Sequence, residues 1–192
     1  MGKIVMSEFV TLDGVIQDPA GNEGFRLGGW VGRVGDQGRE ETDKVLLDQA
    51  LSAEAVLLGR RSYEFLAALW PSRSGELADR LNSLPKYVVS STLEDPEWNN
   101  STVVRGEVVN ELSKLRHDLN GEINVIASFQ LGRTLIEHDL LDELRLMVFP
   151  VVLGAGERLF GETSDKEPVR LLDIRTVGDG VAYLTYELVR EA

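Results

Sequence analysis

The sequence predicts an α/β fold with a mostly parallel central sheet flanked by helices and an antiparallel hairpin at the C-terminus. Two patterns indicate this. Short apolar runs alternate with stretches of helical periodicity, which is typical of parallel strands joined by helical crossovers. Near the end, Val169–Val177 and Val181–Val189 are both strand-like, and the Gly178–Asp179–Gly180 turn between them favours a hairpin.

Clear stop signals divide the first half of the chain. Asp13–Gly14 ends the first strand, and Trp70–Pro71 ends a helix because the residue before a proline avoids helical backbone. Gln17–Gly38 is rich in glycine and shows little periodicity, so we expect a long mobile loop and a candidate lid. The other expected elements are strand Lys3–Leu12, helix Thr42–Leu51, strand Ala55–Leu58, helix Ser62–Leu69 and strand Tyr87–Ser90.

The second half continues the alternation. Apolar residues recur on one face of a predicted helix that runs from Val108 to Leu119 and ends near Gly121. The Gly154–Ala155–Gly156 turn lacks the third glycine and the following helix of a Rossmann fingerprint. The expected elements are strand Thr102–Val104, that helix, strand Ile123–Ala127, helix Leu131–Leu140 and strand Leu144–Leu153.

Composition limits the possible partners. A chain of 192 residues with 43% apolar content predicts one domain, 1–192. Its net charge of −12 repels nucleic acid and anionic lipid, so neither is an expected partner. The absence of cysteine excludes disulfides, thiolate metal sites and thiol nucleophiles, and we expect no metal ion. No signal peptide and no apolar run of about 20 residues is visible, which predicts a cytoplasmic protein.

Several predicted strands end in residues that suit a phosphate group. Gly59 follows a buried strand and lets backbone approach a ligand, while Arg60 and Arg61 add positive charge at a helix N-terminus. The same run also fits a basic helix cap on an exposed face. Ser90 and Ser91 place hydroxyls directly after another strand, although an ordinary strand-ending turn explains this pair better when it is taken alone.

Two more strand ends extend this pattern. Val103–Val104–Arg105–Gly106 ends in a basic residue, and strand Ile123–Ala127 runs straight into a helix at Ser128–Phe129–Gln130–Leu131. Such a junction leaves backbone N–H groups unpaired at the helix N-terminus. We therefore expect these strand ends to form one cofactor site.

The segments Leu141–Gly156 and Ile123–Leu131 together resemble the C-terminal half of the riboflavin-pathway reductase domain (RibD C-terminal type), a relative of dihydrofolate reductase. The Gly59–Arg60–Arg61–Ser62–Tyr63–Glu64 run is nearer the dihydrofolate reductase form. The resemblance extends from Thr11–Gly14 to Gly156 and implies a dihydrofolate reductase-like fold that binds NADPH. The implied cofactor-binding residues are Ile16, Gly59, Arg60, Arg61, Ser62, Ser90, Ser91, Arg105, Ser128, Phe129, Gln130 and Leu131.

Two carboxylates are candidate catalytic residues. Asp43 lies 16 residues before Gly59, at the distance where dihydrofolate reductases place their substrate-binding carboxylate, but it also fits an ordinary helix surface. Asp13 is the second candidate, although Asp–Gly is a common turn. We set Asp142 and Glu143 aside as residues of a solvated connection, and we expect the two histidines, His117 and His138, to be surface residues.

Phe25 and Trp30, in the glycine-rich loop, are candidate substrate-binding residues because aromatic rings stack on flat heterocycles. They fit equally well as anchors of the loop.

The resemblance implies an NADPH-dependent reductase of a small heterocyclic substrate, pterin- or pyrimidine-like, with 5-amino-6-(5-phosphoribosylamino)uracil as one example. The alternative is a non-catalytic dimeric module that binds a nucleotide or pterin. Ala127 and Phe129 depart from the glycine-rich start that these families show at this junction. Met147 stands where dihydrofolate reductases carry a threonine. We also expect a homodimer, because strand Leu144–Leu153 and the hairpin present apolar edges.

Overall fold

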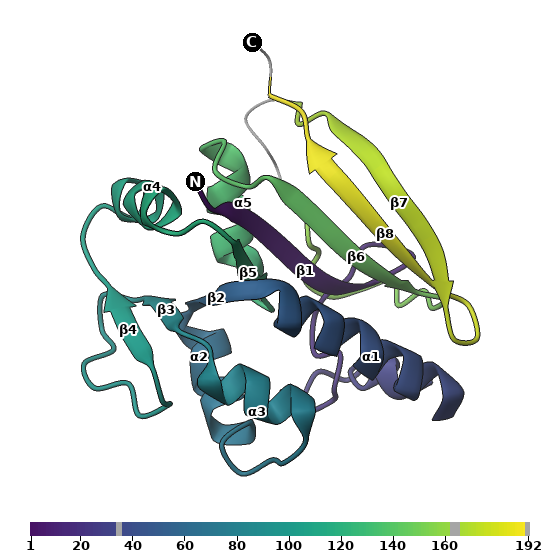
Figure 1. Cartoon of the computed structure of the whole chain (residues 1–192). Helices are drawn as coiled ribbons and strands as arrows, with labels where there is room; N and C mark the ends of the chain where they lie inside the picture. Colours follow the sequence, from purple (N-terminus) through teal and green to yellow (C-terminus); the bar gives the residue numbers. More distant parts are fainter. Residues whose placement is uncertain (34–35, 162–165, 191–192) are drawn as a thin grey trace. The chain divides into compact units, whose positions relative to one another are not determined.

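Figure 1 shows the computed structural model, which describes residues 1–33, 36–161 and 166–190. The chain divides into two compact units. Unit 1 comprises Met1–Met6 and Leu46–Asp142, and unit 2 comprises Ser7–Val45 and Glu143–Ala192. Strand β1 (Lys3–Thr11) contributes its first residues to unit 1 and the others to unit 2, as helix α1 (Asp36–Ser52) does in the reverse order.

Unit 1 contains the parallel part of the sheet. Its strands lie in the order β4-β3-β2-β5-β1, and the pairs β2/β3, β3/β4 and β2/β5 are all parallel. These strands are β2 (Ala53–Gly59), β3 (Lys86–Val89), β4 (Ser101–Val104) and β5 (Glu122–Ile126). The run Ala55–Leu58 is fully buried, as a parallel strand covered on both faces should be. The predicted parallel sheet is thus confirmed.

Four complete helices belong to unit 1. They are α2 (Arg60–Leu69), α3 (Glu76–Ser83), α4 (Val108–Asp118) and α5 (Phe129–Glu137). One core cluster joins Val56 and Leu58 of β2 to Tyr63 and Leu66 of α2 and to Leu81 of α3. Leu112, the only fully buried residue of α4, supplies that helix with its apolar anchor.

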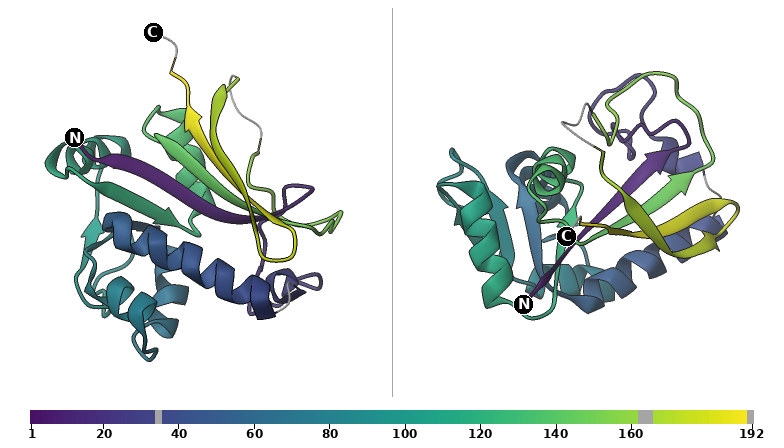
Figure 2. Two further views of the ribbon diagram at one scale, coloured as in Figure 1. Left: turned by 45° about the vertical axis from the view of Figure 1, so that its right-hand side comes forward. Right: turned by 90° about the horizontal axis from the view of Figure 1, so that it is seen from above.

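Unit 2 contains the antiparallel part. Its strands lie in the order β1-β6-β8-β7, where β6 spans Glu143–Phe149, β7 spans Val169–Val177 and β8 spans Val181–Leu188. β8 pairs antiparallel with both neighbours, and Figure 2 shows β7 and β8 as a long twisted pair joined at one end. Gly178 and Gly180 have positive φ angles in the connecting turn, which explains the hairpin signal.

Several predicted boundaries are wrong. Helix α3 was not predicted, β6 ends at Phe149 rather than Leu153 because Pro150 follows, and α1 begins at Asp36 instead of Thr42. Helix α5 occupies Phe129–Glu137 rather than Leu131–Leu140.

The solvated connection expected at Asp142 and Glu143 is also wrong. Asp142 accepts hydrogen bonds from the Ile4 N–H and from Arg116 at 2.8 and 2.6 Å. The Glu143 side chain is buried and pairs with Arg145 at 2.6 Å.

The glycine-rich loop contains more hydrogen-bonded structure than its composition predicts. The buried carboxylate of Asp18 accepts hydrogen bonds from the backbone N–H groups of Asn22, Glu23 and Phe25, at 2.7 to 3.1 Å. A short 3-10 helix follows at Trp30–Arg33. Residues 34–35 of the predicted lid lie outside the described residues. Among the described helices, none is long and apolar enough to cross a membrane.

Candidate cofactor-binding site

Two strand–helix junctions of unit 1 are tied together by side-chain hydrogen bonds. The Gly59 N–H, between β2 and α2, donates to the Ser128 Oγ at 3.0 Å. In return, the Ser62 hydroxyl donates to the carbonyl oxygen of Ala127, which lies between β5 and α5, at 2.5 Å. The Ser128 hydroxyl itself donates to the Ile126 carbonyl at 2.8 Å. These bonds place the N-termini of α2 and α5 side by side.

Both of these helix N-termini suit an anion. Neither helix has a side-chain cap, and neither carries an acidic residue in its first turn. By contrast, α3 and α4 begin with acidic residues that complement the positive end of the helix dipole, namely Glu76, Asp79 and Glu111. The first-turn N–H groups of α2 and α5 therefore provide free positive potential, and the residues present fit the pyrophosphate of a dinucleotide cofactor.

Arginine side chains surround these junctions. Arg60 and Arg61 open α2 and are exposed, and Arg60 lies 3.4 Å from Glu64 in a solvent-exposed pair that contributes little to stability. On α5, the Arg133 guanidinium lies 5.1 Å from the centre of the Phe129 ring. Because the chain has a net charge of −12, most of its surface is expected to be acidic, and this cluster of basic groups differs from it in sign. It favours an anionic ligand here.

The ends of β3 and β4 carry the second set of predicted cofactor-binding residues. The Ser90 Oγ accepts hydrogen bonds from the N–H groups of Thr92 and Leu93, at 3.2 and 2.9 Å, so this hydroxyl organises the turn. Arg105 donates to the Leu93 carbonyl at 2.7 Å and is otherwise exposed, as Ser91 is. At these two strand ends, Ser91 and Arg105 are thus the predicted residues whose side chains a ligand can reach.

The other predicted cofactor residues of unit 1 differ in exposure. Gln130 is exposed, Phe129 is half-buried and Leu131 is buried in the first turn of α5. Any contact of Leu131 with a cofactor would therefore come through its backbone. The structure brings Gly59 into hydrogen-bond contact with Ser128, and Ser62 into hydrogen-bond contact with Ala127, the residue before Ser128.

Asp13 lies in unit 2 and serves as a hub of hydrogen bonds. Its carboxylate accepts from the Thr11 hydroxyl at 2.7 Å and from the N–H groups of Leu153 and Gly154 at 3.2 and 2.8 Å. These bonds, that from Thr11 foremost, lower the pKa of Asp13 to about 2. A carboxyl group with this pKa is ionised near neutral pH, so Asp13 is poorly suited to donate a proton.

The hydrogen bonds of Asp13 connect the Asp13–Gly14 turn with the Gly154–Gly156 turn. Further backbone hydrogen bonds join the same two segments, and one of them runs from the Ile16 N–H to the Glu157 carbonyl oxygen at 2.9 Å. Gly156 has a φ of +121°, and a Cβ there would lie 2.7 Å from Val15. The Gly154–Gly156 turn therefore needs glycine for packing, and Ile16 is buried beside it.

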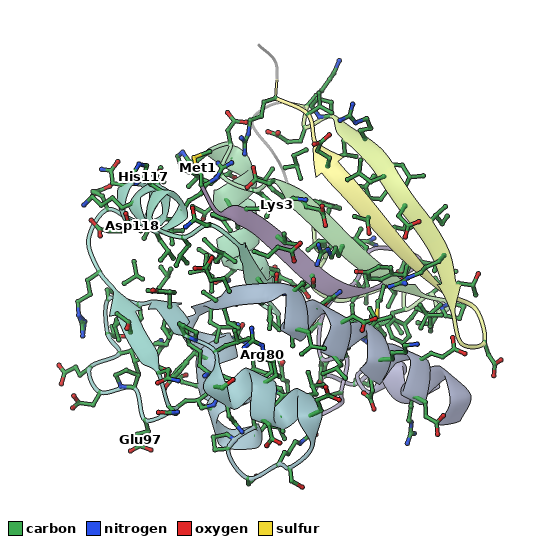
Figure 3. The ribbon with its side chains drawn as sticks, in the orientation of Figure 1. Met1, Lys3, Arg80, Glu97, His117 and Asp118 are labelled. Carbon is green, nitrogen blue, oxygen red and sulfur yellow. The ribbon has the colours of Figure 1, made fainter. Side chains whose placement is uncertain are left out.

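The predicted substrate residues differ in what they offer a ligand. Trp30 is 1% exposed, its Nε1–H donates to the Gln17 carbonyl at 2.9 Å, and its ring packs on Phe149 with centres 5.4 Å apart. This burial leaves it no open ring face. Phe25 is half-buried, and Asp43 is exposed on α1. His117 and His138 are exposed as expected, the former at the end of α4 (Figure 3).

Glu8, on β1, is a titratable group that the sequence analysis missed. Its Oε1 atom is buried and has no hydrogen-bond partner among the described residues. Burial raises the pKa of Glu8 from its ordinary 4.5 to about 8. The signal was present in the sequence, because Ser7 and Glu8 interrupt an otherwise apolar strand.

Comparisons with known proteins agree with this architecture. The model of the RibD C-terminal domain family matches residues 2–183. The uncharacterized protein YyaP of Bacillus subtilis (strain 168) is 28% identical over 193 residues, covering 96% of this chain and 94% of that protein. Among solved structures, a protein of Shewanella sp. PV-4 named for riboflavin biosynthesis superposes with a TM-score of 0.77 at 22% identity, covering 98% and 99% of the two chains.

A dihydrofolate reductase from Enterococcus faecalis, solved with NADP(H), superposes with a TM-score of 0.57 at 14% identity, covering 97% of this chain and 96% of that one. This likeness shows the fold alone, which is dihydrofolate reductase-like as predicted. The family model covers nearly the whole chain, from β1 to β8. The chain therefore belongs to the RibD C-terminal domain family.

Proposed function

We propose that this protein is an NADPH-dependent reductase of a small heterocyclic substrate that is pterin- or pyrimidine-like, with 5-amino-6-(5-phosphoribosylamino)uracil as one example. The observation that carries the proposal is the pair of uncapped, acid-free helix N-termini that Gly59, Ser62 and Ser128 hold together. Membership of the RibD C-terminal domain family supports the same reading.

Each part of the site has a separate task in this proposal. The N-termini of α2 and α5 bind the pyrophosphate, and Arg60 and Arg61 add charge beside it. Ser91 and Arg105 bind the 2′-phosphate that distinguishes NADPH from NADH. The cofactor supplies a hydride, while the chain orients the reactants and excludes water. In unit 2, Asp43 and Phe25 remain the proposed substrate contacts.

Binding and turnover should be measured separately. Calorimetry with NADPH and NADH tests the cofactor: tighter binding of NADPH supports the proposal, whereas equal affinity or no binding contradicts it. Transfer of deuterium from NADPH labelled at the nicotinamide C4 to members of a pterin and pyrimidine panel then tests the reaction. Asp43→Asn should lower turnover and leave NADPH affinity nearly unchanged, because the carboxylate acts on the substrate.

A second candidate function is a non-catalytic module that binds a nucleotide or pterin. It is favoured by the hydrogen bonds that commit Asp13 to the backbone of Leu153 and Gly154, since they remove one of the two predicted acids from chemistry. Tight NADPH binding without deuterium transfer to any substrate of the panel would support this module over the reductase.

A further inference from the structure

Lys86, the first residue of β3, carries a buried ammonium group that no carboxylate pairs with among the described residues. Its side chain is 0% exposed. The Nζ atom donates to the carbonyl oxygens of Asn82, Leu84 and Asn99, at 3.2, 2.8 and 3.0 Å, which satisfies its three donors. A buried charge without a counter-ion is costly. Lys86 therefore differs from a solvated surface lysine and fixes the three backbone segments that it contacts.

Trp98 completes this arrangement from the other side. The Lys86 Nζ lies 4.4 Å from the centre of its ring, in a cation–π contact. The Trp98 Nε1–H donates to the Asn82 Oδ1 at 2.7 Å, and its backbone N–H donates to the Tyr63 hydroxyl at 2.9 Å. Tyr63 is the fourth residue of α2, the helix that Arg60 and Arg61 open. The contacts thus run from β3 through Trp98 to the basic helix.

These contacts act on the chain between β3 and β4, Ser90–Asn100, which we name the β3–β4 segment. Lys86 holds the Asn99 end of this segment, and Tyr63 holds Trp98. At the other end, Leu93 accepts the hydrogen bond that orients Arg105. The segment therefore links a buried cation to the two residues, Ser91 and Arg105, that are proposed to bind the 2′-phosphate.

We infer that Lys86, Trp98 and Tyr63 form a positioning network that sets the cofactor preference of this protein by holding the β3–β4 segment against α2. The inference rests on the proposed function, because it requires that NADPH binds. Displacement of the segment moves Arg105 and Ser91 away from a 2′-phosphate. NADH lacks that phosphate and is insensitive to the displacement.

Three variants separate positioning from general stability. Lys86→Met removes the ammonium group with little change in volume, and Tyr63→Phe removes the hydroxyl that Trp98 contacts. Arg80→Met is the matched control. Arg80 on α3 also donates to carbonyl oxygens, but those belong to Ala50 and Ala53, outside the β3–β4 segment. Figure 3 labels Arg80, together with Glu97 of that segment. Its loss weakens the same unit without releasing the segment.

Calorimetry of the folded variants with both nucleotides is the test. We expect Lys86→Met and Tyr63→Phe to weaken the binding of NADPH about tenfold and the binding of NADH less than about twofold. The difference reflects the loss of charge-assisted contacts to one phosphate group. Arg80→Met should leave the ratio of the two affinities unchanged. Hydrogen exchange should rise in residues 91–105 of both network variants and stay at the wild-type level there in Arg80→Met.

The possible failures are distinct. If the wild-type protein binds neither nucleotide, the proposed function fails and the inference fails with it. If the wild-type protein prefers NADPH and the network variants lose both nucleotides equally, or exchange faster in residues 91–105 without losing the preference, only the inference is overturned. A variant that does not fold is replaced by Trp98→Phe, which keeps an aromatic ring for Lys86 and removes the bond to Asn82; it should give a smaller shift in the same direction.

Discussion

Ala127 holds a left-handed backbone conformation, with a φ of +49°, at the junction of β5 and α5. A residue with a Cβ atom costs about 1–2 kcal/mol in this region, whereas glycine adopts it freely. The junction nevertheless forms, because Ser62 and Gly59 bind its carbonyl oxygen and the neighbouring Ser128. The departure from glycine at this position is thus a local strain in the candidate site.

We expect Ala127→Gly to raise the free energy of unfolding by up to about 1 kcal/mol, since relief of the strain outweighs the added freedom of the unfolded chain. Ala68→Gly, on the exposed side of α2, is the control and should lower it by about 0.5–1 kcal/mol. Urea denaturation of both variants measures the difference. Equal losses in the two variants would show that the backbone strain is absent in solution.

Glu8 makes stability depend on pH. Its carboxyl titrates near 4.5 in the unfolded chain and near pKa 8 in the folded protein, so the folded protein binds more protons between these values. Stability therefore falls as pH rises from about 4.5 to 8. Glu8→Gln should be more stable than the wild type at pH 8, on the order of 4 kcal/mol, and nearly equal to it at pH 4.5. Parallel urea curves at both pH values, with the same difference at each, would contradict this.

At the scale of elements, the junctions of β2/α2 and β5/α5 show how parallel strands build a site. Neighbouring parallel strands end on the same edge of the sheet, so the helices that follow them present their N-termini together. The exchange of hydrogen bonds between Gly59, Ser62, Ala127 and Ser128 then fixes the two helices with respect to each other.

The arginines that open α2 should determine affinity for the cofactor. Replacement of both Arg60 and Arg61 by alanine is expected to weaken NADPH at least about tenfold and NADH far less, because charge next to a phosphate is lost. Arg73→Ala removes a single positive charge beyond the C-terminus of α2 and serves as the control, so its change in binding free energy is compared with half of that of the double replacement. Calorimetry measures the affinity of each variant for both nucleotides. If Arg73→Ala weakens NADPH binding as much for each charge removed, the effect comes from net charge alone.

At the scale of the whole molecule, unit 2 exposes an apolar sheet face. In the register of β7 and β8, Leu171 lies opposite Tyr186 and Ile174 opposite Leu184, all on one face, with Ile174 62% exposed. β7 is also the last strand of its sheet and has β8 as its only neighbour among the described strands. Such a face and edge invite pairing with another chain.

We propose that a second copy of the chain covers this face, so that the protein is a homodimer. Light scattering at micromolar concentration should give twice the 21.3 kDa of one chain. Ile174→Lys should shift it to the monomer, whereas Asp173→Lys, on the opposite face of the same strand, should not. A monomer for the wild-type protein would contradict the proposal.

The order of strands and helices, the parallel sheet and the C-terminal hairpin follow from the sequence, because each depends on local periodicity and on stop residues such as Gly59 and Gly178. The boundaries of helices were harder to predict from the sequence. Helix α3 is short, with only Ala78 and Leu81 buried, so its pattern is weak. Helix α1 begins at Asp36, inside the glycine-rich segment Gln17–Gly38 that was predicted to be a loop, and the glycine content of this segment disfavours a helix.

The sequence by itself determined the fold class and the strand ends that carry the candidate phosphate site, since these features depend on neighbours along the chain. Only the tertiary structure decided what Asp13, Trp30 and Lys86 do. The Asp13 carboxylate meets the Gly154 N–H across 141 positions of sequence, and Trp30 meets Phe149 across a comparable separation. Burial and hydrogen bonding at such separations are set by how strands and loops pack, and no local pattern records them.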